Sequence, residues 1–147
     1  MASVKMCHAD VSCYHRAMTR DIVSTSSAPR AIGPYSQAVI VQGARCIYCS
    51  GQIPLDPETG ELVGNGDVEK ETHRVMQNLE GVLKAAGVSL DAVVKTTIYL
   101  TDLTNFAAVN AVYATYFART PPARATVQVA ALPRGAQIEI DAVAVAD

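Results

Sequence analysis

Residues 67–101, DVEKETHRVMQNLEGVLKAAGVSLDAVVKTTIYLT, contain the two patterns that decide the fold. Apolar side chains recur at helical spacing through residues 68–86, charged ones lie largely elsewhere, and Gly87 supplies a stop. This pattern predicts a first helix over residues 67–86. Residues 93–101 alternate and are rich in β-branched side chains, so they predict a strand soon after that helix.

The segments on either side extend this succession of helix and strand. Asp102 and Thr104 are candidate N-caps for a second helix that ends before Pro121. Turn residues separate the remaining β-prone stretches, which are 22–25, 36–41, 45–50, 123–130 and 137–145. The stretches 36–41 and 45–50 flank Gln42-Gly43-Ala44, and this spacing predicts a β-hairpin. We expect the order ββ-α-β-α-ββ after a minor leading strand, which is an α+β fold with a single mixed sheet backed by two helices.

A sheet of this kind has one face covered by helices and one face left open. Apolar strand residues on the open face form a larger patch than a monomer usually exposes. The sequence therefore predicts an oligomer.

Length and charge narrow the class of protein. The chain has 147 residues, which fits one domain with one core. Residues 1–17 show neither helical nor strand periodicity, so we expect a flexible extension before a domain over residues 18–147. The formal net charge is −2 and no basic stripe appears, so nucleic acid is not an expected partner. No run approaches the ~20 apolar residues of a membrane span, and a cytoplasmic protein is expected, with mitochondrial targeting by residues 1–17 as the alternative.

The motifs for common cofactors and metals are missing, so we expect neither. Cys46 and Cys49 lie three residues apart on a predicted strand, so their sulfurs point to opposite faces and do not converge on one ion. Cys and His residues within 1–17 have no scaffold that would fix a tetrahedral site. No Walker loop, dinucleotide fingerprint or Ser–His–Asp pattern follows a predicted strand.

Arg124 is the residue that says most about function. It is a permanent cation at the start of an otherwise apolar strand, and such a charge needs a partner. One interpretation is a cross-strand ion pair, because a hairpin that turns near Pro133 would bring Arg124 close to Glu139 or Asp141. The other is a planar guanidinium that binds a ligand carboxylate through two parallel hydrogen bonds. The residues alone leave both open.

Glu139 and Tyr35 are the other candidates for chemistry. Glu139 lies between two isoleucines, where it either orients or deprotonates a water or balances the charge of Arg124. Tyr35 follows Gly33-Pro34 in a stiff loop, where it is either a positioned hydroxyl or a packing ring.

The chain from about residue 22 to residue 145 resembles the Rid/YjgF/translation-inhibitor family of enamine/imine deaminases. Six motifs in order carry the resemblance: Ala31-Ile32-Gly33-Pro34-Tyr35-Ser36-Gln37-Ala38, Ser50-Gly51-Gln52-Ile53-Pro54, Val94-Lys95-Thr96-Thr97, Val109-Asn110, Pro122-Ala123-Arg124 and Ile138-Glu139-Ile140-Asp141-Ala142.

The resemblance implies a chorismate-mutase-like fold in a barrel-like homotrimer with sites between subunits. It also implies cofactor-free hydrolysis of small 2-imino and enamine acids, such as 2-aminoacrylate, 2-iminobutanoate and 2-iminopropanoate, to 2-keto acids and ammonia. Arg124 then holds the substrate carboxylate and Glu139 positions the attacking water. The other expected site residues are Tyr35, Ser50, Gly51, Asn110 and Thr126, the last of which stands where many relatives have a cysteine.

Two other functions stay open at this point. One is an RNA-directed, endoribonuclease-like activity that inhibits translation, against which the acidic charge and the lack of stacking aromatics argue. The other is a non-catalytic trimer that binds small carboxylates in the same pocket or acts as a chaperone.

Overall fold

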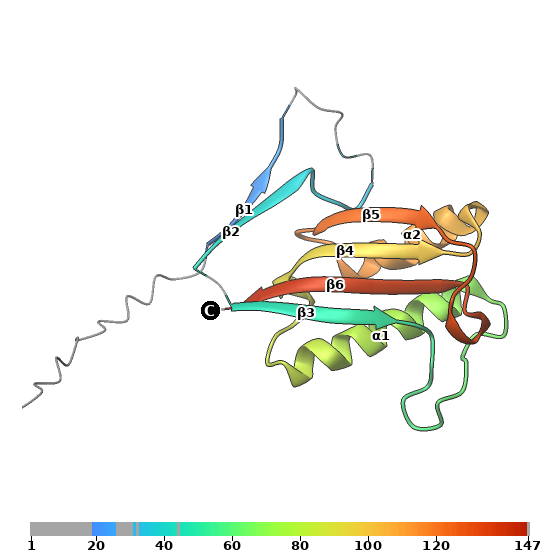
Figure 1. Ribbon diagram of the computed structural model, residues 1–147. Coiled ribbons are helices and arrows are strands. Elements are labelled where there is room, and N and C mark those ends of the chain that lie inside the picture. Colours follow the sequence, from blue (N-terminus) through green and yellow to red (C-terminus); the bar gives the residue numbers. More distant parts are fainter. Residues whose placement is uncertain (1–18, 26–30, 32, 44, 147) are drawn as a thin grey trace, which may run out of the picture.

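The computed structural model describes residues 19–25, 31, 33–43 and 45–146 (Figure 1). The elements are β1 (Thr19–Val23), β2 (Ala38–Gln42), β3 (Arg45–Gln52), α1 (Val68–Ala85), β4 (Val93–Leu100), α2 (Phe106–Tyr116), β5 (Ala123–Gln128) and β6 (Ile138–Ala146). The predicted order of strands and helices is confirmed. The predicted extension over residues 1–17 lies outside the described residues.

The main sheet has four strands in the order β3-β6-β4-β5. β4 and β5 run parallel, whereas β6 is antiparallel to both β3 and β4, so the sheet is mixed as predicted. Both helices lie on one face of this sheet, and the other face carries no helix (Figure 1). On the open face, Tyr48 is 79% exposed and Val127 is 41% exposed, which fits the apolar patch expected there.

The predicted hairpin of residues 36–41 and 45–50 is wrong. β2 pairs with β1 in a separate two-stranded sheet, and β3 pairs with β6 instead (Figure 1). The single sheet of the prediction is therefore a four-stranded sheet and a separate pair. Gly43 does adopt a positive φ of 67°, but such a turn residue marks only where the chain bends. It does not determine which strands pair.

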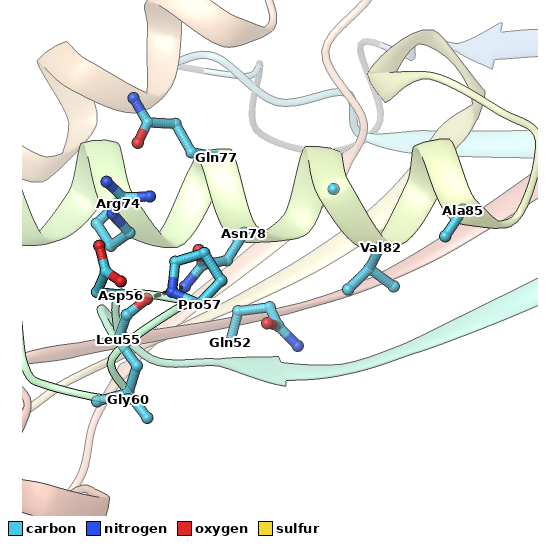
Figure 2. Close-up of a pocket in the computed structure, with 11 residues that line it drawn as sticks. Gln52, Leu55, Asp56, Pro57, Gly60, Arg74, Gln77, Asn78, Val82 and Ala85 are labelled. Carbon is cyan, nitrogen blue, oxygen red and sulfur yellow. Dashed lines mark hydrogen bonds between the residues drawn. The ribbon is translucent and has the colours of Figure 1, made fainter.

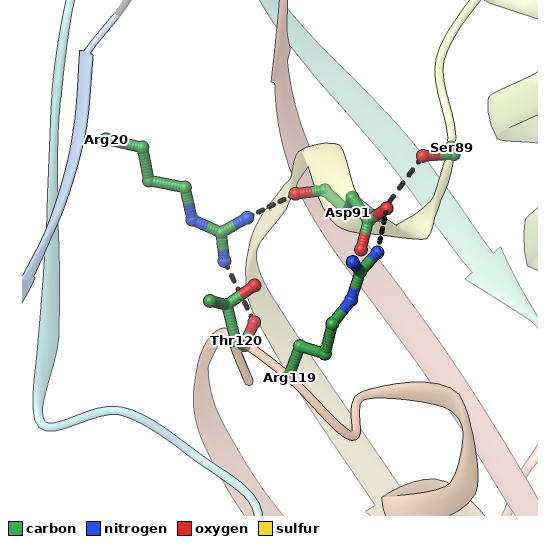
Figure 3. Close-up of polar contacts among 5 residues, drawn as sticks. All are labelled: Arg20, Ser89, Asp91, Arg119 and Thr120. Atoms are coloured by element: carbon green, nitrogen blue, oxygen red, sulfur yellow. Dashed lines mark hydrogen bonds and ion pairs between the residues drawn. The ribbon is translucent and has the colours of Figure 1, made fainter.

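The two-stranded sheet is attached through Arg20. Its guanidinium donates hydrogen bonds to the carbonyls of Asp91 and Thr120, the latter at 3.2 Å (Figure 3). Arg119 forms an ion pair with the Asp91 carboxylate at 3.3 Å in the same group. One arginine thus ties β1 to the turns before β4 and before β5.

The last two strands are not neighbours, because β4 lies between β5 and β6. The turn near Pro133 carries the chain past the end of β4, where Val129 N donates to Leu100 O at 2.8 Å and Thr101 N donates to Gln137 O at 3.1 Å. The hairpin that would have placed Arg124 beside Glu139 is therefore absent.

The core lies between the helices and the inner face of the sheet. α1 begins after Asp67, whose Oδ1 accepts hydrogen bonds from Glu69 N (3.1 Å) and Lys70 N (3.2 Å), and it ends one residue short of the predicted boundary. Its apolar stripe packs on the inner face of β6 and β3. The largest apolar members of this core are fully buried: Val75, Met76, Leu79, Leu83, Ile98, Leu100, Tyr113, Ile138 and Ile140. Within the described residues, no helix is long and apolar enough to cross a membrane.

Candidate functional site

The Arg124 side chain lies among aromatic rings at the edge of the sheet. β5 places it beside α2, and its Nη1 donates a hydrogen bond to Asn110 Oδ1 at 2.8 Å. Its Cζ lies 5.0 Å from the ring centre of Tyr113, 5.6 Å from that of Tyr35 and 5.8 Å from that of Phe106. We call this group, together with Gly33, the arginine cluster.

The loop that carries Gly33 and Tyr35 is fastened directly to the start of β5. Ser36 N donates to Pro122 O at 3.0 Å, and Ser36 Oγ donates to Pro121 O at 2.5 Å. A Cβ added to Gly33 would lie 3.5 Å from Arg124 Nη2, so the loop backbone runs close beside the guanidinium. These contacts bring Tyr35 and Arg124 together, as their expected shared site requires.

Arg124 forms no ion pair with any described residue, so of its two interpretations the cross-strand ion pair with Glu139 or Asp141 is wrong. Asp141 instead accepts hydrogen bonds from Thr97 N (3.1 Å) and the Tyr99 hydroxyl (2.9 Å) on β4. A guanidinium stays charged at neutral pH, and a carboxylate is the ligand it fits best. The arginine cluster thus contains a half-buried positive charge that pairs with no acid in the described part of the chain.

Burial governs the acid–base behaviour of this cluster. It lowers the pKa of Arg124, although not enough to discharge a guanidinium. Burial also raises the pKa of Tyr113 to about 12, against smaller opposing effects of its hydrogen bond with Thr96 and the charge of Arg124. The Tyr113 hydroxyl is therefore neutral at physiological pH and holds Thr96 Oγ1 at 2.7 Å.

Glu139 and Gly51 form a second group, which we call the glutamate cluster. A Cβ added to Gly51 would lie 1.8 Å from Glu139 Oε1 and 2.7 Å from its Cδ, so the carboxylate rests directly on the glycine backbone. A bulge in the pairing of β3 with β6, between Cys49 and Gln52, sets the backbone of Gly51 there. Ser50 precedes this glycine and is exposed. No described residue forms an ion pair with Glu139.

The two clusters lie on opposite faces of the main sheet. Arg124 pairs with Thr96, which is buried under α2, whereas Glu139 pairs with Tyr99 three residues further along β4. Paired residues share a face and successive residues alternate, so Arg124 faces the helices and Glu139 faces the open side. Within one subunit, the two principal candidates do not face the same space.

The sequence profile described as endoribonuclease L-PSP, that of the Rid/YjgF family, matches residues 25–146, which is nearly the whole of the described chain. The chain belongs to this family. Among its relatives, protein DfrA of Myxococcus xanthus is 57% identical over 130 residues, which cover 88% of this chain and 98% of that protein. A 2-iminobutanoate/2-iminopropanoate deaminase of Mus musculus is 54% identical over 129 residues, which cover 88% of this chain and 93% of that protein.

Solved structures of Rid/YjgF proteins share the fold. The YjgF gene product of E. coli matches with a TM-score of 0.65 and 41% identity, covering 86% of this chain and 99% of that one. E. coli TdcF, solved with bound serine, matches with a TM-score of 0.65 and 40% identity over the same shares of the two chains.

Among the expected site residues, Thr126 has a side-chain hydroxyl that lacks a hydrogen-bond partner among the described residues. It lies two residues after Arg124 on β5 and so faces the helices as well. Its Oγ1 is buried and has no hydrogen-bond partner in the described part of the chain. A buried hydroxyl without a partner costs free energy, which makes Thr126 a candidate for contact with a bound molecule.

Other features of the chain stay apart from these clusters. A groove of about 630 Å³ runs between α1 and the loop after β3, and its lining includes none of the expected site residues (Figure 2). Cys46 is exposed and Cys49 is buried, as their opposite directions predicted. The described residues include no group of three or more His, Cys, Asp or Glu side chains that would hold a metal ion.

Sequence reasoning missed Phe106, Tyr113 and Gly33 as neighbours of Arg124. A signal was present in α2, since Phe106, Asn110 and Tyr113 recur at i, i+4 and i+7 and therefore share one helix face. The polar side chain of Asn110 on that face was a sign that a charged group lies beside it.

Proposed function

We propose that this protein hydrolyses small 2-imino and enamine acids, such as 2-aminoacrylate, 2-iminobutanoate and 2-iminopropanoate, to 2-keto acids and ammonia. The observation that carries the proposal is the half-buried guanidinium of Arg124, which binds the amide of Asn110 and has no acid partner over the residues that the structure describes. Relatives that are half identical to this chain bear the name of such a deaminase.

We further propose that the active site forms between subunits of a homotrimer with the chorismate-mutase-like architecture. A cyclic trimer joins one patch of each subunit to a different patch of the next. The arginine cluster at the β5 edge and the glutamate cluster on the open face are two such patches. Docking the edge of one subunit onto the open face of the next would cover the exposed Tyr48 and bring both clusters to one cavity.

The proposed reaction uses only side chains and water. Arg124 binds the substrate carboxylate and, with Asn110 and Tyr35 around it, fixes the direction of the C=N carbon. Glu139 of the neighbouring subunit accepts a proton from a water whose oxygen attacks that carbon. The resulting tetrahedral amino alcohol is stabilised by donors near Ser50 and Gly51. Glu139 returns this proton to the nitrogen and then takes the hydroxyl proton as the C–N bond breaks, so that the carbonyl forms and ammonia and the 2-keto acid leave. An enamine substrate first takes a proton on carbon to become the iminium, which is the form that water attacks.

The direct test follows keto-acid release from 2-iminobutanoate generated in situ by an amino-acid oxidase. We expect the wild type to accelerate release, and Arg124→Ala and Glu139→Gln each to lose at least about 100-fold in kcat/KM. Arg119→Ala and Glu58→Gln, which alter an exposed arginine and an exposed glutamate, serve as matched controls with wild-type rates. Release equal to the buffer rate with the wild-type protein would refute the proposal.

Mixing the two inactive variants tests the shared site. In trimers reassembled from equal amounts of Arg124→Ala and Glu139→Gln chains, three quarters are mixed and each mixed trimer has one intact interface out of three. About one quarter of wild-type activity should therefore return. If mass spectrometry confirms mixed trimers and no activity returns, the site lies within one subunit.

Binding without catalysis is the second candidate, and the TdcF structure with bound serine favours it. In that case, the wild type would bind small carboxylates, Arg124→Ala would abolish binding, and keto-acid release would stay at the buffer rate. The RNA-directed alternative, suggested by the family description, predicts cleavage of single-stranded RNA by the wild type. The net charge of −2 argues against it.

A further inference from the structure

Glu71 is a buried acid that the proposed reaction does not use. It lies on the inner side of α1, is 1% exposed, and forms no ion pair with any described residue. Its Oε2 accepts a hydrogen bond from Gln137 N at 2.9 Å, and its Oε1 accepts one from Gln137 Nε2 at 3.1 Å. Both carboxylate oxygens therefore bind the same residue.

Gln137 stands immediately before β6, two residues ahead of Glu139. Its carbonyl also accepts a hydrogen bond from Thr101 N at 3.1 Å, so α1 and the end of β4 hold its backbone from both sides. The next residue, Ile138, is fully buried in the core. Because strand side chains alternate, fixing the positions of Gln137 and Ile138 also fixes the position and direction of the Glu139 side chain.

Glu71 also packs against the end of the long loop between β3 and α1. A Cβ added to Gly64 would lie 2.5 Å from Glu71 Cγ, so the loop that follows β3 packs tightly against this side chain. Gly64 has a φ of +112°, which permits the backbone to pass so close. One side chain thus contacts Gln137, which leads into Glu139, and Gly64, which ends the loop between β3 and α1.

We propose that Glu71 is a positioning residue that holds the Glu139 carboxylate in place against Gly51. It acts through Gln137 and does not touch substrate, and the proposal rests on the proposed role of Glu139. A stability role alone does not require this contact, since replacing both partners of a buried hydrogen bond by apolar groups of the same shape can be nearly neutral. Placement is a better reason for the contact, because an error of about 1 Å in a reacting group costs up to 10²-fold in rate.

The test compares Glu71→Gln with Glu71→Met in the assembled protein. Glutamine keeps both hydrogen bonds if the Gln137 amide turns over, so its amide oxygen accepts from Gln137 N and its NH₂ donates to Gln137 Oε1. Methionine has a similar volume and no strong acceptor. We expect Glu71→Gln to stay within about threefold of wild type, and Glu71→Met to lower kcat by roughly 10–100-fold. KM should change less than about threefold, because the arginine cluster that binds the carboxylate is untouched.

A merely structural role predicts a different result. Folded Glu71→Met would then melt at a lower temperature and keep the wild-type kcat, and this outcome would overturn the proposal. Should Glu71→Met fail to fold, Gln137→Met tests the proposal instead. It removes the hydrogen bond from Gln137 Nε2 to Glu71 and keeps the one from Gln137 N. We expect its kcat to fall at least about threefold with KM unchanged, and a wild-type kcat would equally overturn the proposal. Failure of the proposed function shows separately, as release at the buffer rate by the wild type or as unaltered hydrolysis in Arg124→Ala and Glu139→Gln.

Discussion

Replacing Gly51 by alanine puts a methyl group where the Glu139 carboxylate now lies. The added Cβ would sit 1.8 Å from Glu139 Oε1 and 3.0 Å from its Cγ. Carbon and oxygen atoms without a bond between them rest at about 3.5 Å, so the carboxylate has to move by roughly 1.5 Å. The atoms displaced are the far end of a flexible side chain, so the free energy of unfolding should fall by less than about 1 kcal/mol.

Activity is expected to respond far more than stability. A carboxylate displaced by more than 1 Å is no longer placed to accept a proton from the attacking water. We therefore expect kcat for 2-iminobutanoate hydrolysis to fall about 100-fold or more. KM should change little, because Arg124 lies on the opposite face of its own sheet. The assay is keto-acid release over a range of substrate concentrations, with thermal unfolding followed by circular dichroism on the same samples. A folded Gly51→Ala protein with the wild-type kcat would refute the placement of Glu139 in the reaction.

Three further substitutions test other parts of the chain. Gly81→Ala adds a methyl group on α1 that meets no described atom within 4 Å. It should raise the free energy of unfolding by about 0.5–1 kcal/mol and leave activity unchanged, because alanine favours a helix more than glycine does. An unchanged melting temperature would contradict this. Tyr113→Phe removes the hydroxyl that holds Thr96 and should cost about 1–3 kcal/mol in denaturant titrations at pH 7. Because the pKa of Tyr113 is raised from 10.0 to about 12, the unfolded chain loses this proton first and wild-type stability should fall by roughly 3 kcal/mol between pH 10 and 12. Tyr113→Phe should lack that part of the fall, and identical pH profiles would contradict the argument. Thr126→Val removes a buried hydroxyl that has no hydrogen-bond partner among the residues described, so stability should not fall. If this hydroxyl binds substrate, kcat/KM should drop about 3–10-fold, and an unchanged kcat/KM would remove Thr126 from the site.

The helices and the order of the elements were predictable because their signals are local. The 3.6-residue period of α1 and its Asp67 cap lie within one short stretch, and the structure reproduces both. Strand pairing was not predictable in the same way. β3 pairs with β6, nearly a hundred residues later in the chain, and the turn residues at Gly43 and Pro133 contain no information about partners so remote.

The same difference separates the two halves of the site prediction. Arg124 and Glu139 were identifiable from sequence because each is a charge in an apolar strand, and the structure gives neither an ion-pair partner among the described residues. The face each one occupies depends on register, and register depends on pairing. A shift of one residue in β5 or β6 would have put both on the same side.

The register of β5 and β6 on β4 links stability to the proposed catalysis. Arg124 pairs with Thr96 and Glu139 with Tyr99, so their positions along β4 differ by three, an odd number. No rotation of a side chain brings an inward-facing group through the sheet, and a single subunit therefore cannot bring both groups to one substrate. If the proposed chemistry is right, the apolar open face has two roles in one contact, because burying it in the trimer both stabilises the assembly and completes the site. Selection for one would then preserve the other, which gives a physical reason for a small domain to keep an exposed Tyr48 on a face that would otherwise favour aggregation.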